Sequence, residues 1–358
     1  MKNRCHLRQK TVADQLPKKV DALLVTTLSN IRYLTGFSGS AGALLLERGR
    51  ATFFTDFRYQ EQAAQEVGTA AEIVIFKTSI IEAVLERLAK HPVKTLGIEG
   101  SLRVDQREAL EKGKAGKLVI VPGLVEKARQ IKDADELKCL RRAFAIADRA
   151  FARLLRYLRP GRTEREIAAR LEFLMRQEGS DGPSFATIIA AGEHASCPHA
   201  QPTDRVLEKG QMVKIDFGAT YRGYHSDMTR TVFLGKADKK FREIYRIVRK
   251  AQKKAVALIA PGAKCFDVDQ AARAYIAKKG YGDHFGHGLG HAIGLDIHEG
   301  PAYSPKSKDT LAAGMVLTVE PGIYLPGWGG IRIEDVYVVT DQGPEKLTGT
   351  PNKLLEIG

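Results

Sequence analysis

Short apolar runs recur through the first third of the chain, each long enough for a β-strand. They lie at residues 21–27, 42–48, 51–56, 71–76, 95–100 and 117–123. Between several of them, apolar positions recur at helical spacing over residues 59–66, 80–90 and 104–114. Strands that alternate with helices predict an α/β domain with a mainly parallel or mixed sheet. We place this domain at residues 1–125.

Two helices follow this domain, and both carry recognisable start signals. A long amphipathic helix is capped by Asp133 or Asp135 and ended by Pro160. Thr163 and Glu166 form a capping box, which opens a second helix that runs to about residue 177.

Strands come next in the chain, again grouped together. They are predicted at 185–191, 211–221 and 226–234, and two more helices follow at about 239–260 and 265–279. The last eighty or so residues show strand patterns and glycine-rich turns, without a short repeat. Helices in blocks and strands in blocks predict an α+β domain, which we place at residues 126–358.

Composition and charge are those of an ordinary globular chain. Its 358 residues suffice for two domains, no apolar run approaches the roughly 18 residues of a membrane span, and the N-terminal stretch is too polar for a signal peptide. The four cysteines form no CxxC pair, so we expect a cytoplasmic location. The net charge of +14 divides equally between residues 1–130 and the rest. Such a spread is typical of a solvated surface, and nucleic acid is not the expected partner.

Two aspartates stand in apolar strand patterns, where a carboxylate needs a partner. Asp216 lies in "VKIDFG", and Asp227 follows eleven residues later, with "TYRGY" between them as a tight hairpin. A loop of residues 221–222 would put the carboxylates directly opposite one another, and a loop of 222–223 would make them diagonal neighbours on one face. A three-residue loop without a bulge would put them on opposite faces. Either two-residue loop predicts a close pair, which is unfavourable unless a cation neutralises it or one carboxyl is protonated.

Two glutamates extend this acidic set. Glu320 lies in "MVLTVEPGIYL" and Glu334 in "GIRIEDVYVV", each flanked by β-branched residues that predict burial. Their spacing of fourteen fits no simple hairpin with an even loop, so the sequence does not pair them. Arg332 offers a salt bridge to one buried acid but not to four. Four acids and a histidine form a hard ligand set that suits a pair of divalent ions and hydrolytic chemistry.

Four of the nine histidines fall within "HFGHGLGHAIGLDIHEGP", at positions 284, 287, 291 and 298. The stretch has no HExxH motif, because Gly300 and Pro301 follow His298 and Glu299, and the chain lacks the GxSxG and P-loop motifs. The zincin, serine-hydrolase and P-loop classes are therefore disfavoured. Any metal held by these histidines needs further ligands from elsewhere in the chain.

Several local sequences around these residues resemble those of one family. "KIDFGATYRGYHSDMTRTV", "HGLGHAIGLDIHE", "TVEPGIY" and "GIRIED" resemble the dinuclear metallopeptidases of the pita-bread fold, which include methionine aminopeptidase, aminopeptidase P and prolidase. This resemblance spans about residues 130–355. "DALLVTTLSNIRYLTGFSGS" and "FFTDFRY" resemble the additional domain of the creatinase, prolidase and aminopeptidase P branch. The resemblance implies an α/β creatinase-like N-terminal domain and an α+β pita-bread catalytic domain.

The resemblance also implies a role for each matched residue. Two divalent metal ions, Mn²⁺ or Co²⁺ ahead of Zn²⁺ or Fe²⁺, would be held by Asp216, Asp227, His291, Glu320 and Glu334. Contacts with the substrate or proton transfer would fall to His199, His287, His298 and Glu320. Arg332 would orient the ligands, and Tyr324 would lie near the substrate. His284 has no counterpart.

The implied reaction is hydrolysis of the Xaa-Pro bond at the N-terminus of proline-containing peptides by a metal-bridged water or hydroxide, as in aminopeptidase P. A prolidase restricted to Xaa-Pro dipeptides is the alternative within the fold. A catalytically silent binding module for protein or nucleic acid is the alternative of another class. Creatinase chemistry, which uses no metal, is disfavoured because all five ligand positions are filled. Relatives form dimers or larger assemblies, so a homodimer without membrane attachment is expected.

Overall fold

The computed structural model describes residues 2–358, which divide into two compact units after Arg129. Helix α6 (Leu124–Arg129) belongs to the first unit, where Glu126 accepts a hydrogen bond of 2.7 Å from Asn30. Across residues 2–358, no helix has both the length and the apolar character that crossing a membrane requires.

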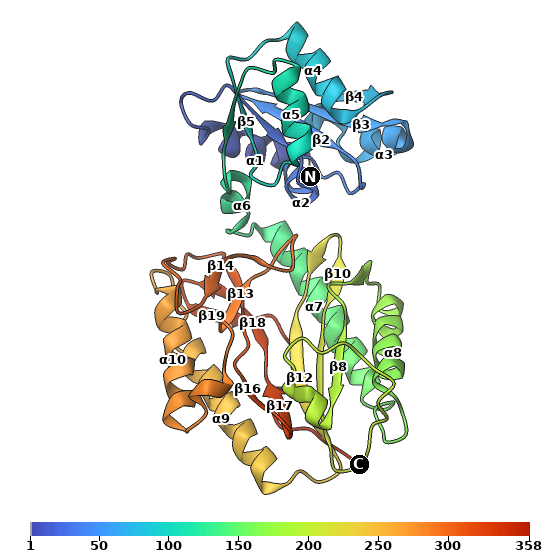
Figure 1. Ribbon diagram of the computed structural model, residues 1–358, viewed down its shortest axis with the longest axis vertical. Coiled ribbons are helices and arrows are strands. Elements are labelled where there is room, and N and C mark those ends of the chain that lie inside the picture. The colour runs from blue at the N-terminus through green and yellow to red at the C-terminus, as the bar shows by residue number, and fades with distance from the viewer. Residues whose placement is uncertain (1) are drawn as a thin grey trace. The chain divides into compact units, whose positions relative to one another are not determined.

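The N-terminal unit is built on one mixed six-stranded sheet (Figure 1). Its strand order is β4-β3-β2-β1-β5-β6, with β1 antiparallel to β2 and parallel to β5. The strands are β1 (Ala22–Val25), β2 (Ala43–Glu47), β3 (Arg50–Asp56), β4 (Glu72–Phe76), β5 (Thr95–Ile98) and β6 (Lys117–Ile120). The helices before α6 are α1 (Lys2–Asp14), α2 (Leu28–Thr35), α3 (Gln60–Glu66), α4 (Ile80–Lys90) and α5 (Val104–Lys112). One face of the sheet packs its apolar residues against α4 and α5.

All six strands and three helices predicted in this part are present, but α1, α2 and α6 were not predicted. Helix α1 is polar over most of its length and buries only a few apolar side chains, Val12 and Ala13 among them. A helix with so narrow an apolar stripe leaves little periodic signal in the sequence. Helix α2 begins at Leu28, and the side chain of Thr27 before it makes no capping hydrogen bond.

The C-terminal unit places its strands between two pairs of helices, with α7 and α8 on one flank and α9 and α10 on the other (Figure 1). The helices are α7 (Ala134–Leu154), α8 (Glu164–Gln177), α9 (Lys239–Val256) and α10 (Cys265–Lys278). Two larger sheets have the orders β20-β12-β9-β8 and β14-β13-β15-β18-β19. Two smaller sheets have the orders β11-β10-β7 and β16-β17. Each pair of helices covers its own apolar core.

Fourteen strands build these four sheets. The first eight are β7 (Gly182–Pro183), β8 (Ile188–Ala191), β9 (Met212–Phe217), β10 (Ala219–Tyr221), β11 (Tyr224–His225), β12 (Met228–Leu234), β13 (Gly290–Ala292) and β14 (Glu299–Tyr303). The last six are β15 (Val316–Val319), β16 (Gly322–Leu325), β17 (Gly329–Arg332), β18 (Asp335–Thr340), β19 (Gly343–Lys346) and β20 (Glu356–Ile357). The single strand predicted at 211–221 is therefore two strands, β9 and β10, which are separated by Gly218.

The helix caps follow the sequence closely. Of the two candidates for α7, Asp133 is the cap, and its side chain accepts from the backbone N–H groups of Asp135 and Glu136. Helix α7 ends at Leu154, well before Pro160. The capping box of Thr163 and Glu166 at the start of α8 is present as predicted.

A two-residue turn, Arg222-Gly223, closes the hairpin that carries both aspartates. Tyr221 pairs with Tyr224, and the turn residues have φ angles of 50° and 75°. Two consecutive left-handed residues are typical of a type I′ turn, whose twist matches that of the flanking strands.

Replacing Gly223 by alanine should lower the free energy of unfolding by about 1 kcal/mol, because a Cβ is strained at positive φ. Gly286→Ala is the control, since Gly286 lies in open space in the same unit without a positive φ. Urea unfolding followed by circular dichroism measures both variants. An equal loss in the two would contradict the assignment of strain to this turn.

Candidate active site

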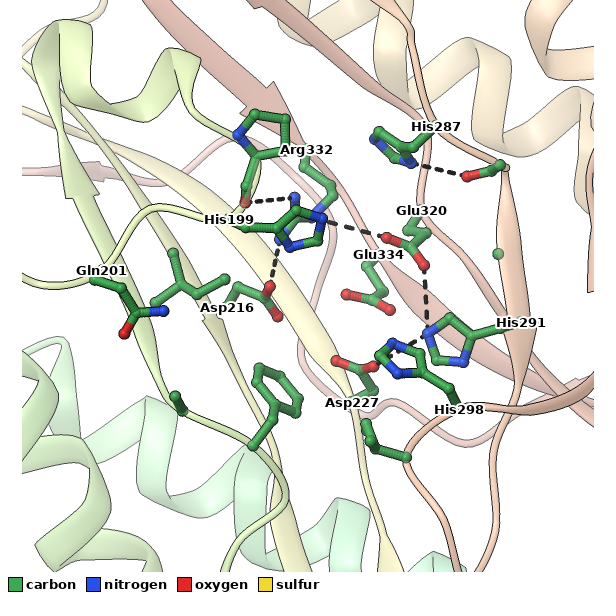
Figure 2. Close-up of a pocket in the computed structure, with 17 residues that line it drawn as sticks. His199, Gln201, Asp216, Asp227, His287, His291, His298, Glu320, Arg332 and Glu334 are labelled. Carbon is green, nitrogen blue, oxygen red and sulfur yellow. Dashed lines mark hydrogen bonds and ion pairs between the residues drawn. The ribbon is translucent and has the colours of Figure 1, made fainter. Parts of the chain in front are cut away.

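A cleft of about 420 Å³ opens in the C-terminal unit. Nine of the ten predicted site residues line it: His199, Asp216, Asp227, His287, His291, His298, Glu320, Arg332 and Glu334. The four carboxylates point toward a common space (Figure 2). The tenth residue, Tyr324, is buried and is not among the lining residues.

The register of the first hairpin brings the two aspartates together. Asp216 pairs with Thr229 across β9 and β12, so Asp227, two residues earlier, is its diagonal neighbour on the same face. This is the second of the two registers considered from the sequence. One oxygen from each of Asp216, Asp227 and Glu334 lies within 4.8 Å of the others, and all three residues are buried.

A second hairpin brings the two glutamates together, although the sequence did not pair them. Val319 pairs with Asp335 on one side of a break in the ladder, and Gly322 pairs with Arg332 on the other. The same register runs through the break, so Glu320 faces Glu334 across it. The hairpin closes with Leu325 opposite Gly329, which leaves a three-residue loop. Only loops of even length are considered in the sequence prediction, which for that reason does not pair Glu320 with Glu334.

The carboxylates are held under strong mutual repulsion. Burial, followed by the charge of Glu334, raises the pKa of Asp227 well above its usual range. Burial, followed by the charge of Glu320, does the same to the pKa of Glu334. Burial raises the pKa of Glu320 to about 7, against the opposing effect of Arg332. Such a group of acids is stable as carboxylates only if positive charge enters the cleft.

Two of the fully buried carboxylate oxygens have no hydrogen-bond partner within residues 2–358: Oδ1 of Asp216 and Oε1 of Glu334. Both are buried, and a buried charged oxygen left unpaired is costly. Their other oxygens are held in place, since Arg332 pairs with Asp216 and the Thr229 hydroxyl donates to Glu334 at 2.7 Å. Oriented carboxylates with free lone pairs fit divalent metal ions.

His291 presents a nitrogen lone pair to the same space. Its Nδ1 lies 3.0 Å from the carbonyl oxygen of Ala292, which can only accept, so Nδ1 carries the proton. Its Nε2 lies 3.6 Å from both Asp227 and Glu320. Burial lowers the pKa of His291, which keeps the ring neutral. A neutral imidazole oriented by a backbone carbonyl is the usual form of a metal-binding histidine.

Arg332, Tyr324 and His287 form a chain of hydrogen bonds behind the acids. The Tyr324 hydroxyl accepts from Arg332 at 3.0 Å and lies 3.0 Å from Nε2 of His287. The Nδ1 of His287 donates to the carbonyl of Gly288 at 2.8 Å. Both ring nitrogens of His287 are thus occupied, and burial lowers its pKa to about 4. These hydrogen bonds join His287 and Tyr324 to Arg332, while the roles expected of them, substrate contact or proton transfer by His287 and a place near the substrate for Tyr324, stay predictions.

The remaining two predicted histidines lie at the open side of the cleft. His199 and His298 are both exposed and line it. The rings of His298 and His291 meet edge to face, with centroids 4.4 Å apart. His284, which the sequence set aside, does not line the cleft.

One buried residue close to the acids was not singled out from the sequence. Lys214 is fully buried in β9, two residues before Asp216. Alternation along a strand puts both side chains on one face. A lysine in phase with an aspartate in an otherwise apolar strand was the signal that could have identified it.

Comparison with known proteins decides the family. Residues 138–341 match the model of metallopeptidase family M24, and residues 8–131 match the creatinase/prolidase N-terminal domain. The chain belongs to metallopeptidase family M24. It is therefore an enzyme of the metallopeptidase class, and membership in M24 implies divalent metal ions. The silent-module alternative is not supported.

Three relatives illustrate how far the similarity extends. The Xaa-Pro dipeptidase of Pyrococcus horikoshii is 39% identical over 338 residues, 94% of this chain and 95% of the relative. The structure of an Xaa-Pro dipeptidase from Bacillus anthracis is 40% identical, with a TM-score of 0.94, and covers 99% of this chain and 100% of its own. An X-Pro aminopeptidase structure from Thermotoga maritima is 37% identical, with a TM-score of 0.89. This match covers 94% of this chain and 98% of the Thermotoga chain. These matches confirm the predicted fold class, a creatinase-like domain followed by a pita-bread catalytic domain.

Metal binding should stabilise this M24 protein more strongly as pH rises. Glu320, with a usual pKa of 4.5 and a folded value of about 7, binds more protons in the folded than in the unfolded state. Its contribution to stability is present below pH 4.5 and is lost as pH rises through 7, where Mn²⁺ would replace the proton. The gain in Tm on adding Mn²⁺ should therefore be larger at pH 8 than at pH 6.

Differential scanning calorimetry of the metal-free protein with and without Mn²⁺ measures this gain. At a metal concentration of 100 Kd the stabilisation should be about 2.7 kcal/mol. Asp227→Asn should remove most of it, and Asp341→Asn, at an exposed position, should not. A gain that is independent of pH, or equal in the two variants, would count against a metal site at these acids.

Proposed function

We propose that this chain hydrolyses Xaa-Pro dipeptides with the help of two divalent ions, Mn²⁺ or Co²⁺. The observation that carries the proposal is the convergence of three buried carboxylates, one half-buried carboxylate and one neutral imidazole on a single cleft. The residues that would hold the ions are Asp216, Asp227, His291, Glu320 and Glu334. Two of these acids keep a buried oxygen without a hydrogen-bond partner in the described chain.

The chain's own groups supply the proton transfers. When bound, a pair of divalent ions lowers the pKa of a shared water and polarises a substrate carbonyl. Glu320, 3.6 Å from Nε2 of His291, is placed to accept the proton of the attacking water. His199 and His298, at the open side, are placed to hydrogen-bond the peptide and to protonate the departing nitrogen. Arg332 holds Asp216 in place and, through Tyr324, orients the wall behind it.

The arrangement suits hydrolysis of the peptide bond that precedes a proline. The nitrogen of an Xaa-Pro bond has no N–H, so an enzyme that grips that group loses a contact. Attack on the carbonyl from a carboxylate-lined cleft does not need it. The imino nitrogen must be protonated as it leaves, and the histidines at the open side of the cleft are placed to supply that proton.

The length of the peptide is the finer part of the proposal. The sequence resemblance favoured an aminopeptidase acting on longer peptides, but the names of the Pyrococcus and Bacillus relatives are those of dipeptidases. We therefore place the dipeptide first. The aminopeptidase is the second candidate, because the Thermotoga structure of similar identity carries that name. A homodimer is part of the proposal and rests on the resemblance alone.

Gly-Pro hydrolysis should require Mn²⁺ or Co²⁺ and should stop on addition of EDTA. Asp227→Asn should lower kcat by at least about 10³-fold, because it removes one charge from the ligand set while keeping its size. The matched control, Asp341→Asn, makes the same chemical change at an exposed position and should leave the rate unchanged. Proline release, measured by a colorimetric assay, tests both. Full activity in Asp227→Asn would overturn the assignment of the site.

Comparison of Gly-Pro with Gly-Pro-Ala separates the two candidates. If the enzyme is a dipeptidase, kcat/KM should be at least about tenfold higher for the dipeptide, which corresponds to 1.4 kcal/mol of transition-state binding. Product analysis by liquid chromatography gives both values under the same metal conditions. A higher kcat/KM for the tripeptide would reverse the order of the two candidates without affecting the metal site.

A further inference from the structure

Lys214 places a buried amine behind the wall of the cleft. The residue is fully buried, and its Nζ donates to three backbone carbonyls at 3.2, 2.5 and 3.3 Å, those of Ala195, Cys197 and Pro198. No carboxylate in residues 2–358 forms an ion pair with it. An ammonium group has three N–H donors, and here each has a carbonyl acceptor.

The three carbonyls belong to the short segment of chain that leads to His199. This segment consists of a 3₁₀ turn, Gly192–Ser196, and the three residues after it. Within the described chain the His199 ring makes no hydrogen bond, and the residue is exposed. Its place in the cleft therefore depends on where the backbone before it is held.

Other contacts anchor this segment at its ends and along one side. Glu164, fully buried, accepts from the backbone N–H groups of Ala191 at 2.8 Å and Thr203 at 2.9 Å. On the β17 side, a Cβ at Gly330 would stand 2.3 Å from the carbonyl oxygen of Ala195, so the segment approaches that strand as closely as only glycine allows. Between the ends, the side chains that hold its carbonyls are Lys214 and, at Pro198, Arg332.

We propose that Lys214 is a positioning residue, whose three hydrogen bonds fix where His199 stands relative to the acids. Lys214 and Asp216 project from the same face of β9, so one rigid strand holds both a proposed metal ligand and the segment that carries a substrate-side histidine. This inference rests on the proposed function, in which His199 meets the peptide.

A purely structural role would explain the burial less well. A buried amine is unfavourable unless its N–H groups have acceptors, and three backbone carbonyls supply them to Lys214. The neighbouring positions of the strand are apolar, and Ile215 on the other face packs into the core beside α7 and α8. An apolar residue at position 214 would fill the space but would leave the carbonyls of Ala195 and Cys197 without a donor.

Hydrogen exchange of the metal-free protein tests the inference without reference to activity. In Lys214→Met, the amides of residues 192–199 should exchange about tenfold faster than in the parent, because the segment opens more easily. The control is Ile215→Val, which perturbs the same strand from its other face and should leave exchange in this segment unchanged. Unchanged exchange in Lys214→Met would overturn the proposal. If that variant fails to fold, Lys214→Gln, which keeps two N–H donors, should show a smaller increase.

Kinetics with Gly-Pro test the consequence for His199. Lys214→Met should lower kcat/KM by about tenfold or more while the gain in Tm from Mn²⁺ stays as in the parent. Combined with His199→Ala, it should cause little further loss, because both changes remove the same contribution. Fully additive losses, or a lost response to Mn²⁺, would overturn the link to His199. An inactive parent enzyme would refute the proposed function and leave the exchange result standing on its own.

Discussion

Repulsion among crowded carboxylates is the constraint on which the C-terminal unit depends. Asp216, Asp227, Glu320 and Glu334 share one cleft, and Arg332 supplies a single compensating charge. In an unfolded chain these four carboxylates would move apart because their charges repel, but in the fold two hairpins hold them close together. The packing of the sheets and helices therefore keeps together charges that repel one another. The attraction of the cleft for cations thus comes from the fold as well as from the residues.

The contrast between the two hairpins shows what sequence alone can reveal about this site. Asp216 and Asp227 could be paired in advance because a two-residue turn and strand alternation leave few registers. Glu320 and Glu334 could not, because their ladder breaks between them and closes with a loop of three residues. Apolar neighbours indicated burial correctly for Asp216, Asp227 and Glu334, whereas Glu320 is only half-buried. The second pairing depends on contacts between strands, which periodicity does not encode.

Similar limits explain the rest of the comparison. Helix α8 was predicted with its cap because Thr163 and Glu166 lie close together in the sequence. Helix α1 was not predicted, because its burial depends on partners distant in the chain. The histidine-rich stretch was recognised as part of the site, but the separate roles of its members come from their neighbours. A backbone carbonyl fixes the tautomer of His291, and Gly288 with Tyr324 occupies both nitrogens of His287.

The acids and the histidines of the open side differ in what holds them. The acids stand on strands or at the break between paired strands, where register fixes their spacing. His199 stands in a loop segment whose placement depends on a few side chains, Lys214 among them. Under the proposed function, changes in that segment would therefore alter how a peptide is held without moving the proposed metal ligands.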